Sequence, residues 1–349
     1  PVLNLKDPKD VELFKQIGKE TALLVKKYGG SLSGEHGDGR LRGAFIPDMI
    51  GEQNFRLVKE IKNTWDPDNI FNPGKIVDTP EMNTSLRYSP GHLHREIETT
   101  FNFSSDLGIL RAAEKCNGSG DCRKSEIIGG TMCPSYMATR DEQHTTRARA
   151  NILREFLTNS DKKNPFNHKE IYEVMDLCLS CKGCKSECPS NVDITKYKAE
   201  FLQHYYEANG IPLRTRAIAY IGHLNKLGSF APGLYNAVLR SNYISGMMKK
   251  MLGFAPKRSI PLLYKTTLRR WLKKTATSHQ PSVNRIYLFA DEFTNYNDAE
   301  IGITAVKLLT ALGYNVVIPK HKFSGRTFLS KGMVKKAAKL ARYNVEALY

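Results

Sequence analysis

The seven cysteines constrain this 349-residue chain more than any other feature, because all of them fall between Cys116 and Cys188. Four form one run, Cys178-Leu-Ser-Cys181-Lys-Gly-Cys184-Lys-Ser-Glu-Cys188-Pro189. This C-x2-C-x2-C-x3-C-P spacing is typical of [4Fe–4S] ligands, since three thiolates on a tight loop can reach three irons of one cubane. Zinc sites usually have two C-x2-C pairs separated by a longer loop. The spacing therefore favours iron–sulfur binding over zinc or free thiols.

The three upstream cysteines form a second, incomplete motif. Cys116 and Cys122 bracket position 119, where a full motif would carry a cysteine and this chain has Ser119. In two-cluster ferredoxins the trailing cysteine of each motif ligates the other cluster. The rule assigns one cluster to Cys133, Cys178, Cys181 and Cys184, and leaves Cys116, Cys122 and Cys188 for the other. The second site stays open between a [3Fe–4S] cluster, a [4Fe–4S] cluster completed by Ser119 or Asp121, and a purely structural role for the upstream cysteines.

The length of the chain allows two or three domains, each with its own core. No apolar run approaches the roughly 18 residues that a membrane span needs. Clustered cysteines without an evident pairing suit a reducing cytosol, so we expect a cytoplasmic protein. The chain begins at Pro1 rather than at methionine, which suggests a piece of a longer protein.

The net charge of +17 is unevenly distributed. No acidic residue lies between Glu207 and Asp291, while Lys, Arg and aromatic side chains alternate through about 211–277. Such a segment can contact anionic lipid, an acidic partner or nucleic acid, or can be a solvated helical linker. No nucleic-acid-binding motif is present, so nucleic acid is not expected as a partner.

Apolar periodicity predicts helices over about 9–28, 51–63, 144–158 and 193–208. A glycine-rich turn, Ser33-Gly-Glu35-His36-Gly37-Asp38-Gly39, follows the first helix, and a turn-rich segment, Asn72-Pro-Gly-Lys75, follows the second. In the C-terminal part, strands are predicted at 285–290 and 315–319, and helices at 299–312 and 331–348. This β-α-β-α order predicts a small parallel α/β unit. Two strands make an unfinished domain, so the C-terminus is expected to be truncated.

Taken together, these segments resemble a known family. The Ser33–Gly39 turn and the Asn72–Lys75 segment resemble the C-terminal end of FAD-linked oxidases of the D-lactate and D-2-hydroxyglutarate dehydrogenase type. The segment from Cys116 to Cys188 resembles the iron–sulfur module fused to bacterial members. The last segment resembles a cysteine-rich, CCG-like domain that has lost its cysteines, since Ala290-Asp-Glu-Phe293 and Phe323-Ser-Gly-Arg326 occupy their places.

The resemblance implies an α+β multi-domain chain. Its expected parts are the end of the oxidase cap at 1–78, a linker at 79–106 and a mainly helical two-cluster ferredoxin-like module at 107–210. A basic helical segment at 211–282 and a partial α/β unit at 283–349 complete the layout. FAD is expected to be bound mostly by an N-terminal domain that this chain lacks.

The resemblance also implies roles for individual residues. His36 matches the base that takes the substrate hydroxyl proton, and Glu35 matches a ligand of a divalent metal such as zinc. Asn72 and Lys75 match the loop that closes over flavin and substrate, while Gly37 and Gly39 let the backbone approach it.

The expected function is part of a dehydrogenase that oxidises a small D-2-hydroxy acid and passes electrons from flavin through the clusters to a quinone or redox protein. Arg140, Arg147 and Arg149 are candidates for raising cluster potentials, for docking, or for ordinary salt bridges. Two alternatives remain: a stand-alone iron–sulfur electron-transfer subunit, and a zinc-stabilised basic binding protein. Peripheral contact of 211–277 with the inner face of the membrane is a further expectation.

Overall fold

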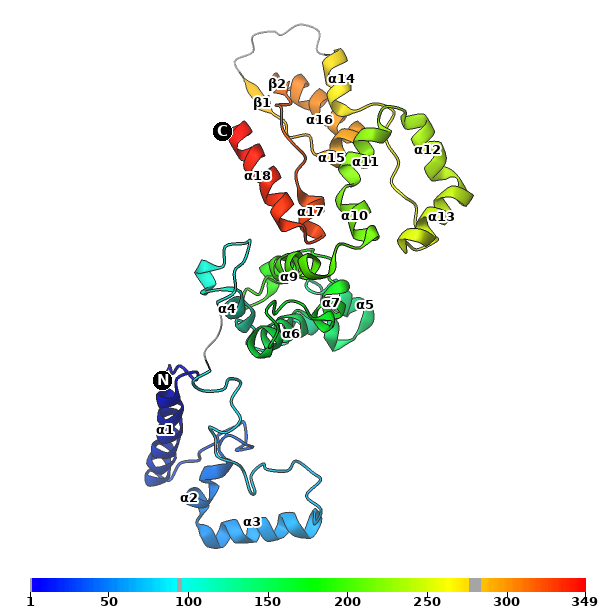
Figure 1. Cartoon of the computed structure of the whole chain (residues 1–349). Helices are drawn as coiled ribbons and strands as arrows, with labels where there is room; N and C mark the ends of the chain where they lie inside the picture. The colour runs from blue at the N-terminus through cyan, green and yellow to red at the C-terminus, as the bar shows by residue number, and fades with distance from the viewer. Residues whose placement is uncertain (1, 93–95, 276–283) are drawn as a thin grey trace. The chain divides into compact units, whose positions relative to one another are not determined.

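The computed structural model describes residues 2–92, 96–275 and 284–349. The predicted boundary between 282 and 283, and positions 93–95 of the predicted linker, lie outside the described residues. The chain divides into two compact units, Pro1–Arg95 and Glu96–Tyr349, which are described separately below. Helices dominate both units (Figure 1). No helix of the described ranges is long and apolar enough to cross a membrane.

The first unit contains α1 (Pro8–Lys27), α2 (Ile46–Ile50) and α3 (Glu52–Trp65). The first helix starts where it does because Pro8 occupies its first turn and the Asp7 carboxylate accepts a hydrogen bond from the Lys9 amide at 2.9 Å. The predicted helices at 9–28 and 51–63 correspond to α1 and α3. The glycine-rich turn lies between α1 and α2, and the Asn72–Lys75 segment follows α3.

The cysteines of the second unit lie in loops and short helices around a helical core. Its first helices are α4 (Ile109–Glu114), α5 (Pro134–Thr139), α6 (Thr146–Asn159), α7 (Lys169–Asp176), α8 (Gly183–Glu187) and α9 (Ile194–Asn209). Here α6 packs against α4, α7 and α9. Leu153, Met175 and Phe201 are fully buried in this core, and Cys116, Cys122, Cys133 and Cys184 belong to the same buried cluster. The helices predicted at 144–158 and 193–208 correspond to α6 and α9.

A buried carboxylate fastens the beginning of this unit to α9. Glu200 has no exposed surface. It accepts hydrogen bonds from the backbone amides of Thr100 at 2.7 Å and Phe101 at 2.9 Å. The His204 ring nitrogen Nε2 lies 3.0 Å from the same carboxylate. The segment that enters the unit is therefore held by charge-assisted hydrogen bonds rather than by apolar packing alone.

The basic segment contains α10 (Leu213–Ala219), α11 (Ile221–Gly228), α12 (Pro232–Arg240), α13 (Asn242–Leu252) and α14 (Leu268–Thr275). The segment at 211–277 was predicted to be helical; it consists of these five separate helices, and its last two positions lie outside the described residues. Pro232 begins a new helix, and Gly253 ends α13 in the left-handed conformation, with φ 65°. Residues 254–267 contain no helix.

The C-terminal part contains β1 (Arg285–Tyr287), α15 (Glu292–Tyr296), α16 (Ala299–Ala311), β2 (Asn315–Val317), α17 (Arg326–Ser330) and α18 (Val334–Leu348). The two strands pair in parallel, with Ile286 opposite Val316, as the predicted order requires (Figure 1). Both strands are shorter than predicted, and α15 and α17 were not predicted. Gly302 lets α16 approach α14, because a Cβ there would lie 2.5 Å from Leu268.

Candidate functional site

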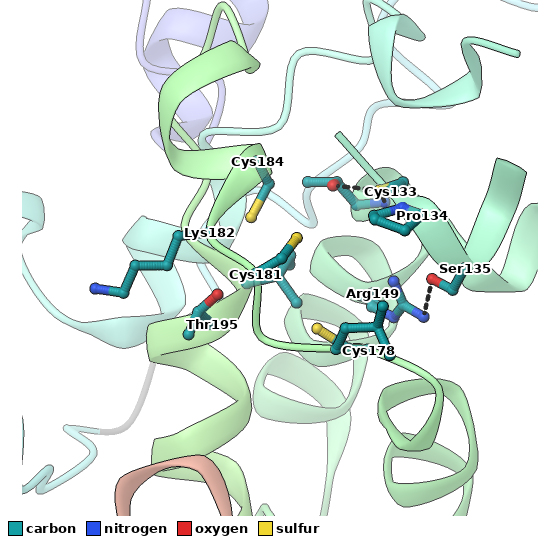
Figure 2. Close-up of a pocket in the computed structure, with 12 residues that line it drawn as sticks. Cys133, Pro134, Ser135, Arg149, Cys178, Cys181, Lys182, Cys184 and Thr195 are labelled. Atoms are coloured by element: carbon teal, nitrogen blue, oxygen red, sulfur yellow. Dashed lines mark hydrogen bonds between the residues drawn. The ribbon is translucent and has the colours of Figure 1, made fainter. Parts of the chain in front are cut away.

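Four cysteines from two distant segments line one pocket (Figure 2). Cys133 immediately precedes α5, Cys178 and Cys181 lie in the loop between α7 and α8, and Cys184 lies in the first turn of α8. These are the four residues that the two-cluster rule assigns to one complete cluster. Thiolates are soft donors that suit iron–sulfur clusters, so the chemistry of the donor set fits a [4Fe–4S] cluster.

The backbone of the Cys133 segment and of the Cys178–Cys184 segment has conformations that let the two segments come close together. Cys133, Ser180 and Lys182 have left-handed conformations, with φ of 57°, 56° and 65°. Gly183 passes so close to the other segment that a Cβ there would lie 2.8 Å from the Thr131 carbonyl oxygen. A side chain at position 183 would therefore push apart the two segments that carry the cysteines.

Glu187, which the sequence did not single out, clamps the Cys133 segment onto α8. Its carboxylate accepts hydrogen bonds from the Thr131 amide at 2.7 Å, the Thr131 hydroxyl at 2.6 Å and the Met132 amide at 3.1 Å. The Thr131 hydroxyl and these amides hold the pKa of Glu187 below its ordinary value. Cys133 is thereby fixed opposite the loop that carries the other three cysteines.

Helix N-termini point at two of the pocket sulfurs. The Thr146 amide at the start of α6 donates to Cys133 Sγ at 3.0 Å, and the amides at the start of α9 bond Cys184. Burial nevertheless raises the pKa of each thiol to about 11. Both thiols must lose a proton when a metal binds, so cluster insertion is coupled to proton release. The N–H donors would then help to stabilise the thiolates.

The remaining three cysteines do not line this pocket. Burial raises the pKa of Cys122, while the Arg147 amide of α6 opposes the shift. Cys122 and Cys133, from the two predicted ligand sets, therefore meet at the same end of α6. Cys116 is buried close enough to act on Cys122 electrostatically, and Cys188 is partly buried, with its amide bonded to the Cys184 carbonyl at 3.1 Å.

The two non-cysteine candidates for the second site differ in their surroundings. Ser119 is exposed, and its backbone amide donates to the Asn117 side chain at 3.1 Å. Asp121 lies 3.7 Å from the Lys124 ammonium. The identity of the second site's fourth ligand thus stays a prediction.

The three candidate arginines differ in their surroundings. Arg140 pairs with Glu126, and Arg147 pairs with Glu142 at 2.7 Å. Arg149 is only 2% exposed. It donates to the Val174 carbonyl and to the Ser135 hydroxyl, each at 3.0 Å. Figure 2 shows it beside Cys178.

A second buried cation, Lys198, was missed at the sequence level. Its ammonium donates to the Cys178 carbonyl at 2.7 Å and to the Asp176 carbonyl at 3.1 Å. A signal for its burial was available, because Lys198 falls between Ile194 and Leu202 on one apolar stripe of α9.

The two oxidase-like loops, Ser33–Gly39 and Asn72–Lys75, lie in the first unit. Glu35 and His36 are 83% and 78% exposed, and Glu35 Oε1 lies 3.0 Å from His36 Nε2. Among the described residues, no third ligating side chain joins them to form a metal site. Gly37 and Gly39 have left-handed φ values of 70° and 53°, which suits glycine.

The two oxidase-like loops meet each other. The Ile76 amide donates to the Gly39 carbonyl at 2.9 Å, and Lys75 Nζ donates to Asn72 Oδ1 at 3.1 Å. Asp38, which the sequence did not single out, has a buried Oδ1 with no hydrogen-bond partner among the described residues.

Two family models match the chain. Residues 1–76 match the C-terminal domain of FAD linked oxidases, and residues 115–193 match a 4Fe-4S dicluster domain. The chain therefore joins an FAD-oxidase C-terminal domain to a ferredoxin-like 4Fe-4S dicluster domain, and the predicted resemblance is confirmed.

The chain is homologous over its whole length to D-2-hydroxyglutarate dehydrogenases. It is 30% identical over 398 aligned residues to the enzyme of Pseudomonas putida and 28% identical over 396 to that of Escherichia coli. Both alignments cover 100% of this chain but 38% of the relative, so the chain spans well under half of these proteins. Over 133 residues, 37% of this chain, it is also 28% identical to 33% of one of the subunits of the anaerobic glycerol-3-phosphate dehydrogenase of Escherichia coli. No solved structure matches the chain.

Proposed function

We propose that this chain is part of an FAD and iron–sulfur dehydrogenase that oxidises a small D-2-hydroxy acid. The observation that carries the proposal is the pocket lined by Cys133, Cys178, Cys181 and Cys184, in a chain that also carries an FAD-oxidase domain. When bound, FAD would accept two electrons from the substrate and the clusters would pass them on singly to a quinone or redox protein.

The chain's own residues divide this work between two places. One cluster would be held by the four pocket cysteines, and a second by Cys116, Cys122 and Cys188 with a further ligand or as a three-iron cluster. At the other place His36 would take the substrate hydroxyl proton on its imidazole, which suits a base near pH 7. Glu35 would ligate a divalent metal together with residues from outside the described chain.

The flavin would be approached by the two loops that meet at Gly39 and Ile76. Asn72 and Lys75 would close over it, and the left-handed backbone at Gly37 and Gly39 would permit close contact. The buried, unpartnered oxygen of Asp38 supports this placement, because a buried acceptor requires a donor.

The finer layout is also proposed: oxidase end at 1–78, linker at 79–106, cluster module at 107–210, basic segment at 211–282 and a partial α/β unit at 283–349. The α/β unit would be structural or a docking element. In support, Glu292 accepts hydrogen bonds from the Ser324 amide at 2.9 Å and hydroxyl at 2.8 Å. Arg326 lies 3.1 Å from Asp291. The two segments that stand in place of the cysteine motifs are thus joined by polar side chains.

Substrate oxidation tests the activity. The full gene product containing this chain, with FAD and clusters present, is expected to oxidise D-2-hydroxyglutarate, D-lactate or glycolate. His36→Asn is expected to lower kcat by about 10²-fold or more, since general base catalysis contributes on that order, while His92→Asn serves as the exposed-histidine control.

Two outcomes of the same assay would contradict the proposal. If no substrate is oxidised although the cofactors are intact, the stand-alone electron-transfer subunit becomes the favoured function. A reduced flavoprotein should then reduce the clusters of this chain. Zinc without iron would instead support the zinc-stabilised binding protein.

The basic segment is proposed to contact anionic phospholipid at the inner face of the cytoplasmic membrane. Tyr243, Met247 and Met251 are exposed and recur every four residues, so they form one stripe on α13. Lys250 lies beside this stripe, and residues 208–290 contain no acidic side chain. An exposed apolar stripe flanked by basic residues is typical of helices that lie in the membrane interface.

We expect this chain to float with vesicles that contain anionic phosphatidylglycerol and not with neutral phosphatidylcholine vesicles, and to detach as salt rises. The double variant Met247→Glu, Met251→Glu should lose most of this binding. Ile301→Glu, at an exposed apolar position on α16, is the control. Absence of flotation with anionic vesicles would contradict the membrane contact.

A further inference from the structure

Two buried cations bond the chain at the four-cysteine pocket: Arg149 lines the pocket, and Lys198 donates to the Cys178 backbone carbonyl. Arg149 is 2% exposed and Lys198 is 9% exposed. Within the described part of the chain, their hydrogen bonds go to backbone carbonyls and to the Ser135 hydroxyl rather than to Asp or Glu side chains. Burying an unpaired charge is costly, so such a charge normally has a counter-charge close by.

Both cations converge on the segment around Cys178. Arg149 lines the pocket together with Cys133 and Cys178 (Figure 2), and its charge acts on the Cys133 thiol. Lys198 holds the Cys178 carbonyl at 2.7 Å. Asp176 acts on Lys198 only through space, and Lys331 adds a further positive charge nearby.

The surroundings of Cys116 and Cys122 differ. The cation beside them, Arg147, already pairs with Glu142 at 2.7 Å, and Glu142 also pairs with Arg123 at 3.0 Å. The positive charge of Arg147 is therefore paired directly with a carboxylate, whereas near the four-cysteine pocket Asp176 offsets Lys198 only through space.

We propose that Arg149 and Lys198 are positioning residues that raise the reduction potential of the cluster held by Cys133, Cys178, Cys181 and Cys184. This inference rests on the proposed function, since it assumes that the pocket holds a cluster. A cluster with four thiolate ligands gains one negative charge when it takes up an electron, and nearby cations stabilise that state. A single electron taken up by the chain should therefore reside mainly on the four-cysteine cluster.

A purely structural role is the competing account, because both cations also bond backbone carbonyls. Two kinds of substitution separate the accounts. Lys198→Gln and Arg149→Gln remove the charge but keep a side-chain N–H donor, whereas Arg149→Lys keeps the charge and changes the hydrogen-bond geometry. Arg140→Gln removes an exposed arginine that is already paired with Glu126 and is the control.

The experiment is a dithionite redox titration of the anaerobically purified chain at pH 7, followed by EPR, with iron and sulfide measured for each variant. For each charge-removing variant we expect one reduction step to move to lower potential, with the reduced-to-oxidised ratio at fixed potential falling about tenfold, which is about 59 mV for one electron. The other step should stay in place. Arg149→Lys should restore the shifted step, and Arg140→Gln should leave both unchanged.

Unchanged potentials in Lys198→Gln and Arg149→Gln, with full iron and sulfide, would overturn the inference. If Arg149→Gln fails to assemble its clusters, the reduction potentials of Lys198→Gln alone decide between the effect on the potential and a purely structural role. Absence of iron from the unsubstituted chain would instead overturn the proposed function, so the two failures are distinguishable.

Discussion

Replacing Cys133 by serine is expected to remove the same cluster as replacing Cys181, although the two residues lie in different loops. The reason is that both side chains line one pocket. Iron should fall from about eight to about four per chain, the content expected of two cubanes and of one. Cys188 follows the last of the pocket cysteines in the sequence. Cys188→Ser should remove the other cluster. Iron and sulfide analysis with EPR before and after dithionite, on protein purified without oxygen, measures the effect.

Ser119→Ala is the matched control for the four-cysteine cluster, because Ser119 is exposed and does not line the pocket. The EPR signal of the four-cysteine cluster should be unchanged in this variant. The swapped-ligand assignment is wrong if Cys133→Ser and Cys188→Ser remove the same cluster. A signal in the oxidised unsubstituted chain that disappears on reduction would identify a three-iron cluster at the second site.

The grouping of the four pocket cysteines could be predicted because most of their spacing is local. Four cysteines within one short run favour cluster binding without knowledge of the fold, and the two-cluster rule adds Cys133 to three of them. What the spacing could not provide is the set of groups that hold the loops in place. Glu187 reaches Thr131 and Met132 across the pocket, a contact between distant positions that no pattern in either segment encodes.

Helices were predicted well where they are long enough to show several turns of apolar periodicity, as for α1, α6, α9 and α18. The helices that were not predicted have five to eight residues, too few to show several turns of apolar periodicity; they are α2, α4, α5, α7, α8, α15 and α17. The division of the basic segment was foreseeable in part, because Pro232 and Gly253 are ordinary start and stop signals. The contact between the Gly39 and Ile76 backbones depends on how two irregular loops close, which local pattern does not determine.

Removing the Glu200 carboxylate is expected to cause the largest loss of stability among single substitutions in the cluster module. Glu200→Ala leaves the Thr100 and Phe101 amides and His204 without their shared acceptor. Leaving a buried donor without its acceptor typically costs about 1–3 kcal/mol, and this substitution leaves several donors unsatisfied at once. Urea unfolding followed by circular dichroism, without oxygen, measures the change in the free energy of unfolding.

Glu207→Ala is the matched control on the same helix. Glu207 pairs with Lys335 at 2.6 Å, but its side chain is 42% exposed, so its loss should cost less than about 1 kcal/mol. Equal effects of the two substitutions would contradict the special role of Glu200.

The same carboxylate should make the module sensitive to acid. Burial alone would raise the pKa of Glu200, but the bonds from His204 and from the Thr100 and Phe101 amides outweigh it and lower the pKa below the ordinary value of 4.5. A group whose pKa is lower in the folded state binds its proton more weakly there than in the unfolded chain. Its stabilisation is therefore complete above the unfolded pKa and is lost as the pH falls through the folded value. In Glu200→Gln the unfolding free energy should be lower near neutral pH and should depend less on pH below about 4.5. An acid limb as steep as that of the unsubstituted chain would show that other carboxylates govern it.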